Sequence, residues 1–432
     1  MTPLEFVKRQ TRRLVISSWA DIAGTGGANV ARMFASLAIV VITTRTLGPA
    51  GRGLFAAASA WMMMFGTAAS LSMGPVIVTL TAGRPKEEWS PAMAGTAVAL
   101  TGVVAAAAWA IAAVLYLASA GSVFAGLTPG VLAAAFLAVP FFIADDNARY
   151  LLYSLDGLGR YNRAQIVGAV TGPVAAAVLL IGLGWGVPGA LLAVALSYAA
   201  SVSVAWTSVI REVGRLRLAW PVGARLVSQG LKLHLNAIGN YLFTQASVVI
   251  LSYYRAPSDV GYYQLAMQLF SLALVLPAAF GAVAYRTVAQ KGPDGAWREQ
   301  RVLLQHAVLA AIAAAGAGYV LAPIGIRLVA GEAFLPAVPL FRFIAPSLVG
   351  AALSAVMASQ WVARGLLLQV SALTLAVGVI SLACDLILIP RLGVHGAVIS
   401  TVVTYALSIV GNGAMALRIS WRLRNAPDAC TP

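Results

Sequence analysis

Residues 47–55 read LGPAGRGLF, and the pattern returns at residues 255–263 as RAPSDVGYY, with proline, glycine and an aromatic residue in the same order. The offset is 208 positions, 255 minus 47. A second pair of matching turns, GVPGA and GVHGA, begins at Gly186 and at Gly393. The chain is therefore an internal duplication. Duplicated bundles of membrane helices are typical of secondary transporters, whose substrate site lies between the repeats.

The composition between these turns excludes a soluble globular protein. Hydrophobic residues make up 60% of the 432 residues, charged residues only 10%, and the mean hydropathy is +0.86. Soluble domains carry about a quarter charged residues. About twelve apolar stretches are long enough to cross the ~30 Å hydrocarbon core as helices. They lie roughly at 22–46, 53–82, 92–119, 127–155, 161–183, 187–210, 231–254, 260–285, 302–328, 335–361, 366–389 and 394–420.

Positive charge alternates between the loops that join these stretches. Of the 29 Lys and Arg residues, loops of one parity and the termini hold 21, loops of the other parity hold five, and three lie within spans. The positive-inside rule then predicts that both termini are cytoplasmic. The net charge of +15 is thus explained by topology, with attraction to anionic membrane lipids as a secondary effect. The charge does not require a nucleic-acid partner.

The predicted fold is an all-α polytopic membrane protein with two parallel six-helix repeats around a central cavity. We expect an N-terminal lobe at 1–210, a cytoplasmic linker at 211–230, a C-terminal lobe at 231–420 and a cytoplasmic tail at 421–432. Because each lobe has an even number of helices, the repeats are parallel, and such lobes can rock to open either face.

Polar stripes on corresponding helices of the two repeats predict a hydrated cavity. Residues spaced by three or four share one helix face, and polar side chains in membrane helices are costly. The alternative is hydrogen bonding between helices, worth about 0.6 kcal/mol per contact. The predicted cavity residues are Asn29, Arg32 and Ser36 in the first span, Asn236, Asn240 and Thr244 in the seventh, and Gln264 and Gln268 in the eighth.

Arg32 is the sharpest single candidate. An arginine about two turns inside a membrane helix costs roughly 2.5–3.5 kcal/mol unless it meets water, a partner or an anion. Its planar fork suits bidentate binding of phosphate. The alternatives are extension to the membrane surface and pairing with Asp21.

Three charged residues in the fourth span form a second candidate group. Asp145 and Asp146 lie four and three residues before Arg149, so all three share one helix face. Arg149 can neutralise one carboxylate and leave the other to bind a proton or sodium. A paired structural cluster is the equal alternative. We expect Asp385, about a turn from the end of its span, to meet interfacial water instead.

Motifs for catalysis, metal binding or nucleotide binding are absent from the sequence. It contains no GxSxG, HExxH or Walker A pattern, and the three histidines share no ligand spacing. We therefore expect no enzyme activity, no metal and no cofactor. Transport would be driven by an ion gradient, the membrane potential or the substrate gradient.

Four segments resemble polysaccharide biosynthesis proteins, the O-antigen and exopolysaccharide flippases of the multidrug/oligosaccharidyl-lipid/polysaccharide (MOP) exporter superfamily. Residues 44–55 are similar to the family signature after the first helix, and 255–263 to its second-repeat counterpart. Residues 331–342 resemble the segment before helix 10, and 389–397 the turn before helix 12. The resemblance covers most of the chain.

The resemblance implies flipping of an undecaprenyl-diphosphate-linked oligosaccharide from the inner to the outer leaflet of a bacterial cytoplasmic membrane. Arg32 and the polar stripes would meet the diphosphate and sugars, and glycosyltransferases and a glycan polymerase would be partners. Lipid II flippases usually carry two further helices and more cavity arginines, which argues against that cargo. A cation-coupled multidrug antiporter of the same fold is the main alternative. A glycan polymerase or ligase would show a sizeable outer loop.

Overall fold

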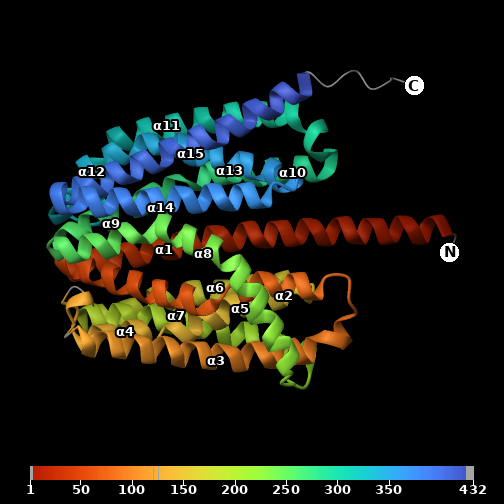
Figure 1. Ribbon diagram of the computed structural model, residues 1–432, viewed down its shortest axis with the longest axis horizontal. Helices are drawn as coiled ribbons and strands as arrows, with labels where there is room; N and C mark the ends of the chain where they lie inside the picture. Colours follow the sequence, from red (N-terminus) through yellow and green to blue (C-terminus); the bar gives the residue numbers. More distant parts are fainter. Residues whose placement is uncertain (1–2, 120, 125, 425–432) are drawn as a thin grey trace. The chain divides into compact units, whose positions relative to one another are not determined.

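The computed structural model describes residues 3–119, 121–124 and 126–424, with side chains described for most of residues 31–420 (Figure 1). The described residues are helical and contain no strand. The helices are α1 (Pro3–Ser70), α2 (Met73–Thr81), α3 (Lys86–Ala118), η1 (Ser122–Phe124), α4 (Pro129–Phe136), α5 (Val139–Ser154), α6 (Leu158–Ala176), η2 (Ala177–Gly182), α7 (Gly186–Val213), α8 (Trp220–Tyr254), α9 (Pro257–Ala273), α10 (Val275–Gly295), α11 (Trp297–Val329), η3 (Glu332–Phe334), α12 (Ala337–Ile344), η4 (Ala345–Ser347), α13 (Leu348–Ala363), α14 (Leu367–Leu392) and α15 (Val394–Arg424).

The turn that opens the repeat is a break inside the long helix α1. Gly48 adopts φ 64°, a left-handed conformation that glycine tolerates, and Pro49 follows it. The helix resumes until Leu71 and Ser72, which also have positive φ values of 48° and 51°. The predicted span at 53–82 therefore consists of the second half of α1 together with α2.

Three other predicted spans are divided at prolines. The span at 127–155 consists of α4 and α5, the span at 335–361 of α12, η4 and α13, and the span at 260–285 of α9 and α10, which bend by 42°. Pro140 lies at the start of α5, Pro346 within η4 and Pro277 near the start of α10. Proline cannot donate a backbone hydrogen bond, so each division has a local cause.

The helical membrane architecture is confirmed, whereas the count of twelve spans is not. Among the described residues, nine helical segments are long and apolar enough to span a membrane, or ten if α9 and α10 are taken as one span. The first two predicted spans merge into one segment across Gly48. Helix α8 falls short because polar residues such as Asn240 and Gln245 lower its hydropathy.

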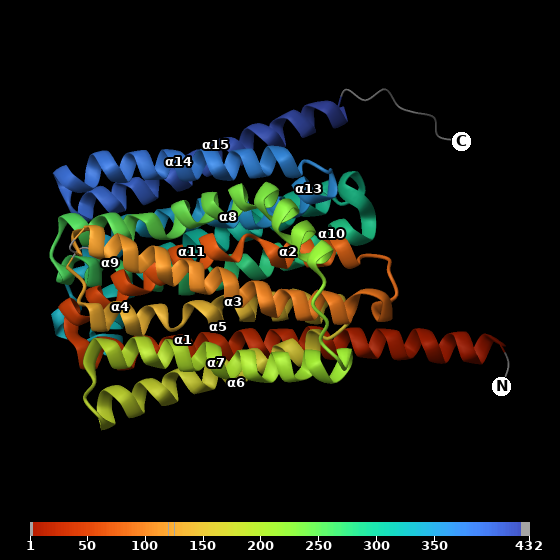
Figure 2. The same cartoon turned by 60° about the horizontal axis from the view of Figure 1, so that its bottom comes forward.

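The chain folds into two compact units. The first contains Met1–Leu47 and Trp61–His234, and the second contains Gly48–Ala60 and Leu235–Pro432. In the first unit α7 packs along α6, and in the second α15 packs along α14 (Figures 1 and 2). The turn at Gly48–Ala60 thus belongs by its contacts to the second unit, which also holds its repeat partner.

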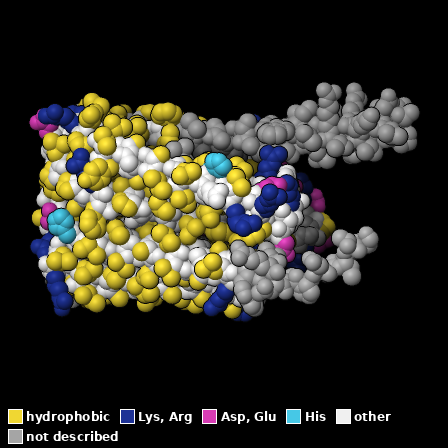
Figure 3. All heavy atoms as spheres, turned by 90° about the horizontal axis from the view of Figure 1, so that it is seen from above, with side chains coloured by type: hydrophobic (Ala, Val, Ile, Leu, Met, Phe, Trp, Pro, Cys, Tyr) yellow, Lys and Arg dark blue, Asp and Glu magenta, His cyan; other side chains and the backbone are white. Residues whose placement is uncertain are grey.

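Hydrophobic side chains cover most of the face shown in Figure 3, and Lys, Arg, Asp and Glu gather at its two ends. The exposed large residues include Val320, Leu328 and Val410. This distribution suits helices whose sides contact lipid and whose ends contact water.

Candidate functional site

The second unit contains a polar cavity of about 340 Å³, here called the α9 cavity. Three of the predicted cavity residues, Thr244, Gln264 and Gln268, line it together. Helix α8 contributes the threonine and α9 the two glutamines, which are spaced by four and so share one face. The other lining residues are Phe243, Gln245, Val248, Tyr263, Met267, Phe270, Ser271, Leu274, Thr401, Thr404 and Tyr405.

Gln268 is held in place by a buried arginine, Arg52, that was expected in a loop. Arg52 is only 1% exposed, and its Nη2 donates to Oε1 of Gln268 at 2.7 Å. The guanidinium also lies 4.9 Å from the centre of the Phe55 ring. Arg52 was expected in a turn between two spans, whereas the structure places it within the helix α1, buried in the second unit. The side of the membrane on which it lies stays a prediction.

A second cavity of about 340 Å³ adjoins the first and is here called the α14 cavity. Asn240 lines it with Ser354, Thr374, Ser408 and Asn412. Phe243 and Tyr405 line both cavities and make an edge-to-face pair with ring centres 5.2 Å apart. The predicted stripe on α8 is thus divided between two cavities.

Asn236 and Ser247, which follow the spacing of Asn240 and Thr244 along α8, line neither cavity. Asn236 is exposed on the helix surface. Ser247 turns away from the cavities, and its hydroxyl donates to Oδ2 of Asp385 at 2.7 Å. A helix face defined by spacings of four, four and three drifts around the axis, so its ends contact different neighbours.

Asp385 is completely buried, so the expectation that it meets interfacial water was wrong. Helix α14 continues to Leu392 and places this carboxyl group about two turns from its end. Ser400 of α15 lies beside the carboxyl group and donates to the backbone oxygen of Ser381 at 3.2 Å. Asp385 forms no ion pair with a described residue. A buried charge without a countercharge is costly, so this site favours a bound proton or cation.

The α9 cavity and the Asp385 site share a wall. The Tyr263 hydroxyl lies 3.1 Å from the Thr401 hydroxyl, and both residues line the cavity. Tyr263 also interacts electrostatically with the carboxyl group of Asp385. A change in the charge of this carboxyl group can therefore alter the cavity lining.

In the first unit, Arg32 and Asp145 belong to one hydrogen-bonded network. Arg32 Nη1 donates to Oε1 of Gln165 at 3.2 Å, and Nε2 of Gln165 donates to both oxygens of Asp145 at 3.2 and 3.3 Å. The Ser201 hydroxyl donates to Asp145 Oδ1 at 2.6 Å. Gln165 on α6 is the link that the sequence analysis missed, because nothing in sequence spacing relates it to α1 or α5.

The other two charged residues of the fourth span form an ion pair. Arg149 pairs with Asp146, and its guanidinium lies 4.6 Å from the centre of the Tyr150 ring. Asp145 is left to the network of hydroxyl and amide donors described above. The two adjacent carboxyl groups thus have different surroundings.

The remaining predicted residues are placed as follows. Ser36 is exposed on α1, and the side chain of Asn29 lies outside the described side chains. Among the described residues, no three His, Cys, Asp or Glu side chains gather in a group that could hold a metal ion.

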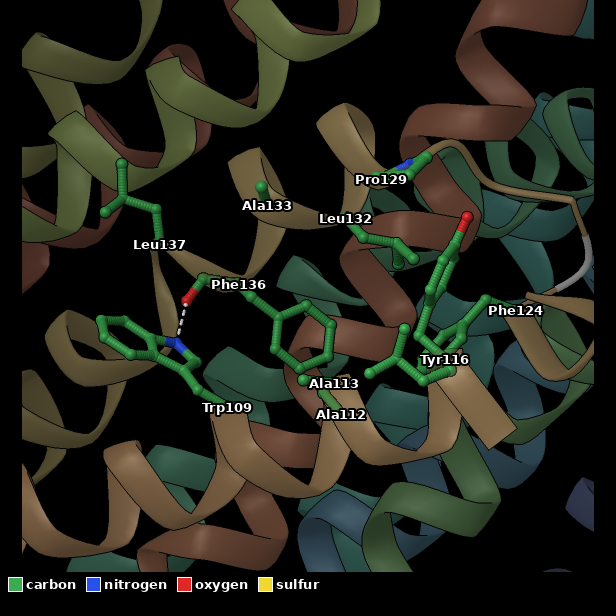
Figure 4. Close-up of a pocket in the computed structure, with 11 residues that line it drawn as sticks. Trp109, Ala112, Ala113, Tyr116, Phe124, Pro129, Leu132, Ala133, Phe136 and Leu137 are labelled. Carbon is green, nitrogen blue, oxygen red and sulfur yellow. Dashed lines mark hydrogen bonds between the residues drawn. The ribbon is translucent and has the colours of Figure 1, made fainter. Parts of the chain in front are cut away.

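A further cavity in the first unit is apolar and contains none of the predicted residues. It has a volume of about 520 Å³ between α3 and α4. Trp109, Tyr116 and Phe136 line it (Figure 4). The Trp109 indole donates to the backbone oxygen of Phe136 at 2.9 Å, so its one polar group is satisfied. The lining offers contacts to apolar groups but little to a charged or sugar ligand.

Comparisons with known proteins identify the sequence family. The family model described as polysaccharide biosynthesis protein matches residues 42–339, which is more than half of the chain. No curated protein matches the sequence.

Solved structures identify the fold. An inward-facing multidrug resistance transporter of the MATE family and MOP superfamily has a TM-score of 0.71 and 16% identity, covering 91% of this chain and 96% of that one. The lipid II flippase MurJ in an inward closed conformation has a TM-score of 0.76 and 12% identity, covering 93% and 90%. The eukaryotic MATE transporter AtDTX14 has a TM-score of 0.64 and 14% identity, covering 95% and 97%. At these identities the likeness shows a shared fold.

Proposed function

The chain belongs to the polysaccharide biosynthesis protein family, and from this premise we propose that it flips a lipid-linked oligosaccharide across the bacterial cytoplasmic membrane. The cargo would be an undecaprenyl-diphosphate-linked oligosaccharide for surface polysaccharide, moved from the inner to the outer leaflet by alternating access. Glycosyltransferases that build the cargo and a polymerase that extends it would be partners.

The observation that carries this proposal is the chemistry of the α9 and α14 cavities. Their polar lining consists of amides, hydroxyls and the Trp361 indole, accompanied by Phe243 and Tyr405. Amide and hydroxyl groups both donate and accept hydrogen bonds, as sugar hydroxyls require. No acidic side chain is among the described residues that line either cavity. An acidic side chain is a common countercharge for a cationic drug, so a lining without one favours a neutral glycan.

Arg32 supplies the candidate contact for the diphosphate. Its Nη1 donates to Gln165, and Arg32 is an exposed residue of the first unit. An arginine held on one side by an amide keeps its fork geometry, which matches phosphate oxygens. Gln165 and Asp145 would then act as positioning residues for the guanidinium.

Two carboxyl groups are candidates for coupling transport to an ion gradient. Asp385 is buried beside Ser247 and Ser400, and Asp145 is held by Ser201 and Gln165. A proton or a sodium ion on either group would remove the cost of a charge in a low-dielectric site. Binding and release on opposite sides of the membrane would bias the alternation of access.

Deletion of the gene tests the cargo. We expect loss of a surface polysaccharide and accumulation of lipid-linked oligosaccharide in the inner leaflet, both restored by the wild-type gene. Loss of the polysaccharide with no accumulation of monomeric lipid-linked unit would contradict flipping and favour a role in synthesis. Unchanged surface glycan with new sensitivity to cationic dyes would support the multidrug antiporter instead.

Cysteine labelling tests the proposed orientation. Ser258, at the start of α9, should react with an impermeant thiol reagent from outside the cell, and Ser228, on α8, only after permeabilisation. Ser228 is exposed and Ser258 is half-buried, and replacement by cysteine changes a single atom in each. The background should lack Cys384 and Cys430. Labelling of both positions from the same side would refute the topology.

A further inference from the structure

A third polar cavity lies in the first unit, between α6 and α7, and contains none of the residues assigned above. It has a volume of about 390 Å³ and is here called the arginine pocket. Arg160, Arg163 and Arg211 line it. The remaining lining residues are Ser203, Val204, Thr207 and Ser208.

The local charge of the arginine pocket is strongly positive. Arg160 donates through Nη1 to Oε2 of Glu212 at 2.9 Å and through Nη2 to the backbone oxygen of Leu155 at 3.1 Å. Glu212 also pairs with Lys86. The lining therefore carries three arginines, and the one carboxylate that pairs with any of them, Glu212, is shared with Lys86. Both Arg163 and Arg211 are exposed.

The hydroxyl groups of the pocket do not supply the donors for an anion. Ser203 donates to the backbone oxygen of Ala199 at 2.7 Å, and Thr207 donates to that of Ser203 at 2.6 Å. Their protons are thus used within α7. The guanidinium groups are therefore the hydrogen-bond donors available to an anion. The hydroxyl oxygens add polar surface to the lining.

The position of these arginines opposes ordinary helix electrostatics. Arg160 and Arg163 lie in the first two turns of α6, where the helix dipole presents partial positive charge and disfavours cations. The positive-inside rule accounts for basic residues at this end of the helices, but it does not require three of them to line one cavity. An anion in the pocket would be attracted both by the arginines and by the N-terminus of α6.

The three arginines also lie at one end of the helices that carry them. Arg160 and Arg163 are near the beginning of one membrane-spanning segment, Leu158–Gly182, and Arg211 is near the end of the next, Gly186–Val213. All three are therefore at the same end of an antiparallel helix pair, which the distribution of basic residues predicts to be cytoplasmic. In this orientation the phosphates of the cytoplasmic leaflet would lie at the level of the pocket.

We propose that the arginine pocket binds a phosphate group, supplied by the headgroup of an anionic membrane lipid. Arginine forks match phosphate oxygens, and basic pockets between membrane helices recognise anionic headgroups. The lipid acyl chains would lie along the apolar sides of α6 and α7, where Val170 and Val174 are exposed. This site is separate from the cavities that the proposed cargo would use.

Lipid binding to the purified full-length protein tests the proposal. Native mass spectrometry would measure retention of cardiolipin and phosphatidylglycerol against phosphatidylethanolamine. The Arg163→Gln/Arg211→Gln variant should bind anionic lipid about 25-fold more weakly, since each of the two basic residues near an anionic surface contributes on the order of a fivefold factor. Arg298→Gln/Arg301→Gln removes equal charge from exposed positions in the first turns of α11 and should retain wild-type binding.

A second arm distinguishes lipid from a soluble phosphate compound. Inorganic pyrophosphate would be titrated in detergent, with the thermal unfolding temperature as the readout. Selective retention of anionic lipid identifies the headgroup as the source, and stabilisation by pyrophosphate without lipid retention identifies a soluble phosphate compound. Arg163→Lys/Arg211→Lys keeps the charge and should bind more tightly than the Gln pair. Equal binding by the wild type, the Gln pair and the α11 pair would overturn the proposal.

Discussion

Gly53 and Gly261 occupy equivalent positions in the two sequence repeats and pack against each other in the second unit. The contact is reciprocal. A Cβ atom on Gly53 would lie 1.6 Å from the backbone oxygen of Pro257, and one on Gly261 would lie 2.2 Å from that of Pro49. The repeated prolines and glycines thus form one backbone-to-backbone contact between the two repeats.

Gly53→Ala and Gly261→Ala should each destabilise the protein. The new methyl group meets backbone that cannot rotate away, and such overpacking costs about 3 kcal/mol. We expect a clearly lower unfolding temperature of the detergent-purified protein. Gly102→Ala on α3 is the control, because its Cβ would meet nothing within 4 Å. If all three variants unfold at the same temperature, the turns are not in contact as described.

Gln268→Leu should be more harmful than Gln264→Leu, although both residues line the α9 cavity. Loss of the Gln268 amide leaves the buried Arg52 without its 2.7 Å acceptor, at a cost of about 2 kcal/mol. We expect a lower unfolding temperature for the Gln268 variant and weaker transport for both. Arg52→Met combined with Gln268→Leu should cost less than the two single effects added together. Strict additivity in this double-mutant cycle would argue against the interaction.

Asp385→Asn should abolish ion-coupled transport without reducing protein abundance. The amide keeps the shape and removes the charge, so the buried site becomes cheaper to fold. Transport in proteoliposomes and abundance by immunoblot would be measured together. Asp156→Asn is the control, because Asp156 is exposed and asparagine tolerates its positive φ of 53°. Full ion-dependent transport by the Asp385 variant would place the coupling group elsewhere, with Asp145 as the next candidate.

The ion itself can be identified with the same pair of proteins. If sodium binds at Asp385, sodium chloride should raise the unfolding temperature of the wild type more than potassium chloride does. If a proton binds at Asp385, acidification should raise the unfolding temperature of the wild type, and sodium chloride should have no more effect than potassium chloride. Neither sodium chloride nor acidification should raise the unfolding temperature of Asp385→Asn as it raises that of the wild type.

Arg32→Lys should impair transport and Arg32→Gln should abolish it, with near-normal protein abundance in both. A point ammonium cannot reproduce the bidentate fork, and the glutamine amide removes the charge. Complementation of the gene deletion would be read alongside an immunoblot. A merely structural arginine predicts that lysine is tolerated and that activity follows abundance in the glutamine variant. Arg391→Gln, at the end of α14, controls for loss of one positive charge.

The sequence by itself determined the membrane class, the duplication and the grouping of polar residues on α8 and α9. These features depend on local composition and on helical periodicity, which act within a few turns. It also placed Thr244, Gln264 and Gln268 on faces that could meet in one cavity. The count of twelve spans is not confirmed where Gly48 joins two helices and where polar residues reduce the hydropathy of α8.

Only the tertiary structure decided which polar groups are partners. The link from Arg32 through Gln165 to Asp145 joins three helices, and the buried Arg52 reaches Gln268 from the other repeat. The burial of Asp385 likewise depends on α8 and α15 closing over α14. Helical periodicity fixes the direction in which a side chain points from the axis of its helix. Which helix stands in that direction is set by long-range packing, and that packing determines whether a polar group meets water, lipid or a partner.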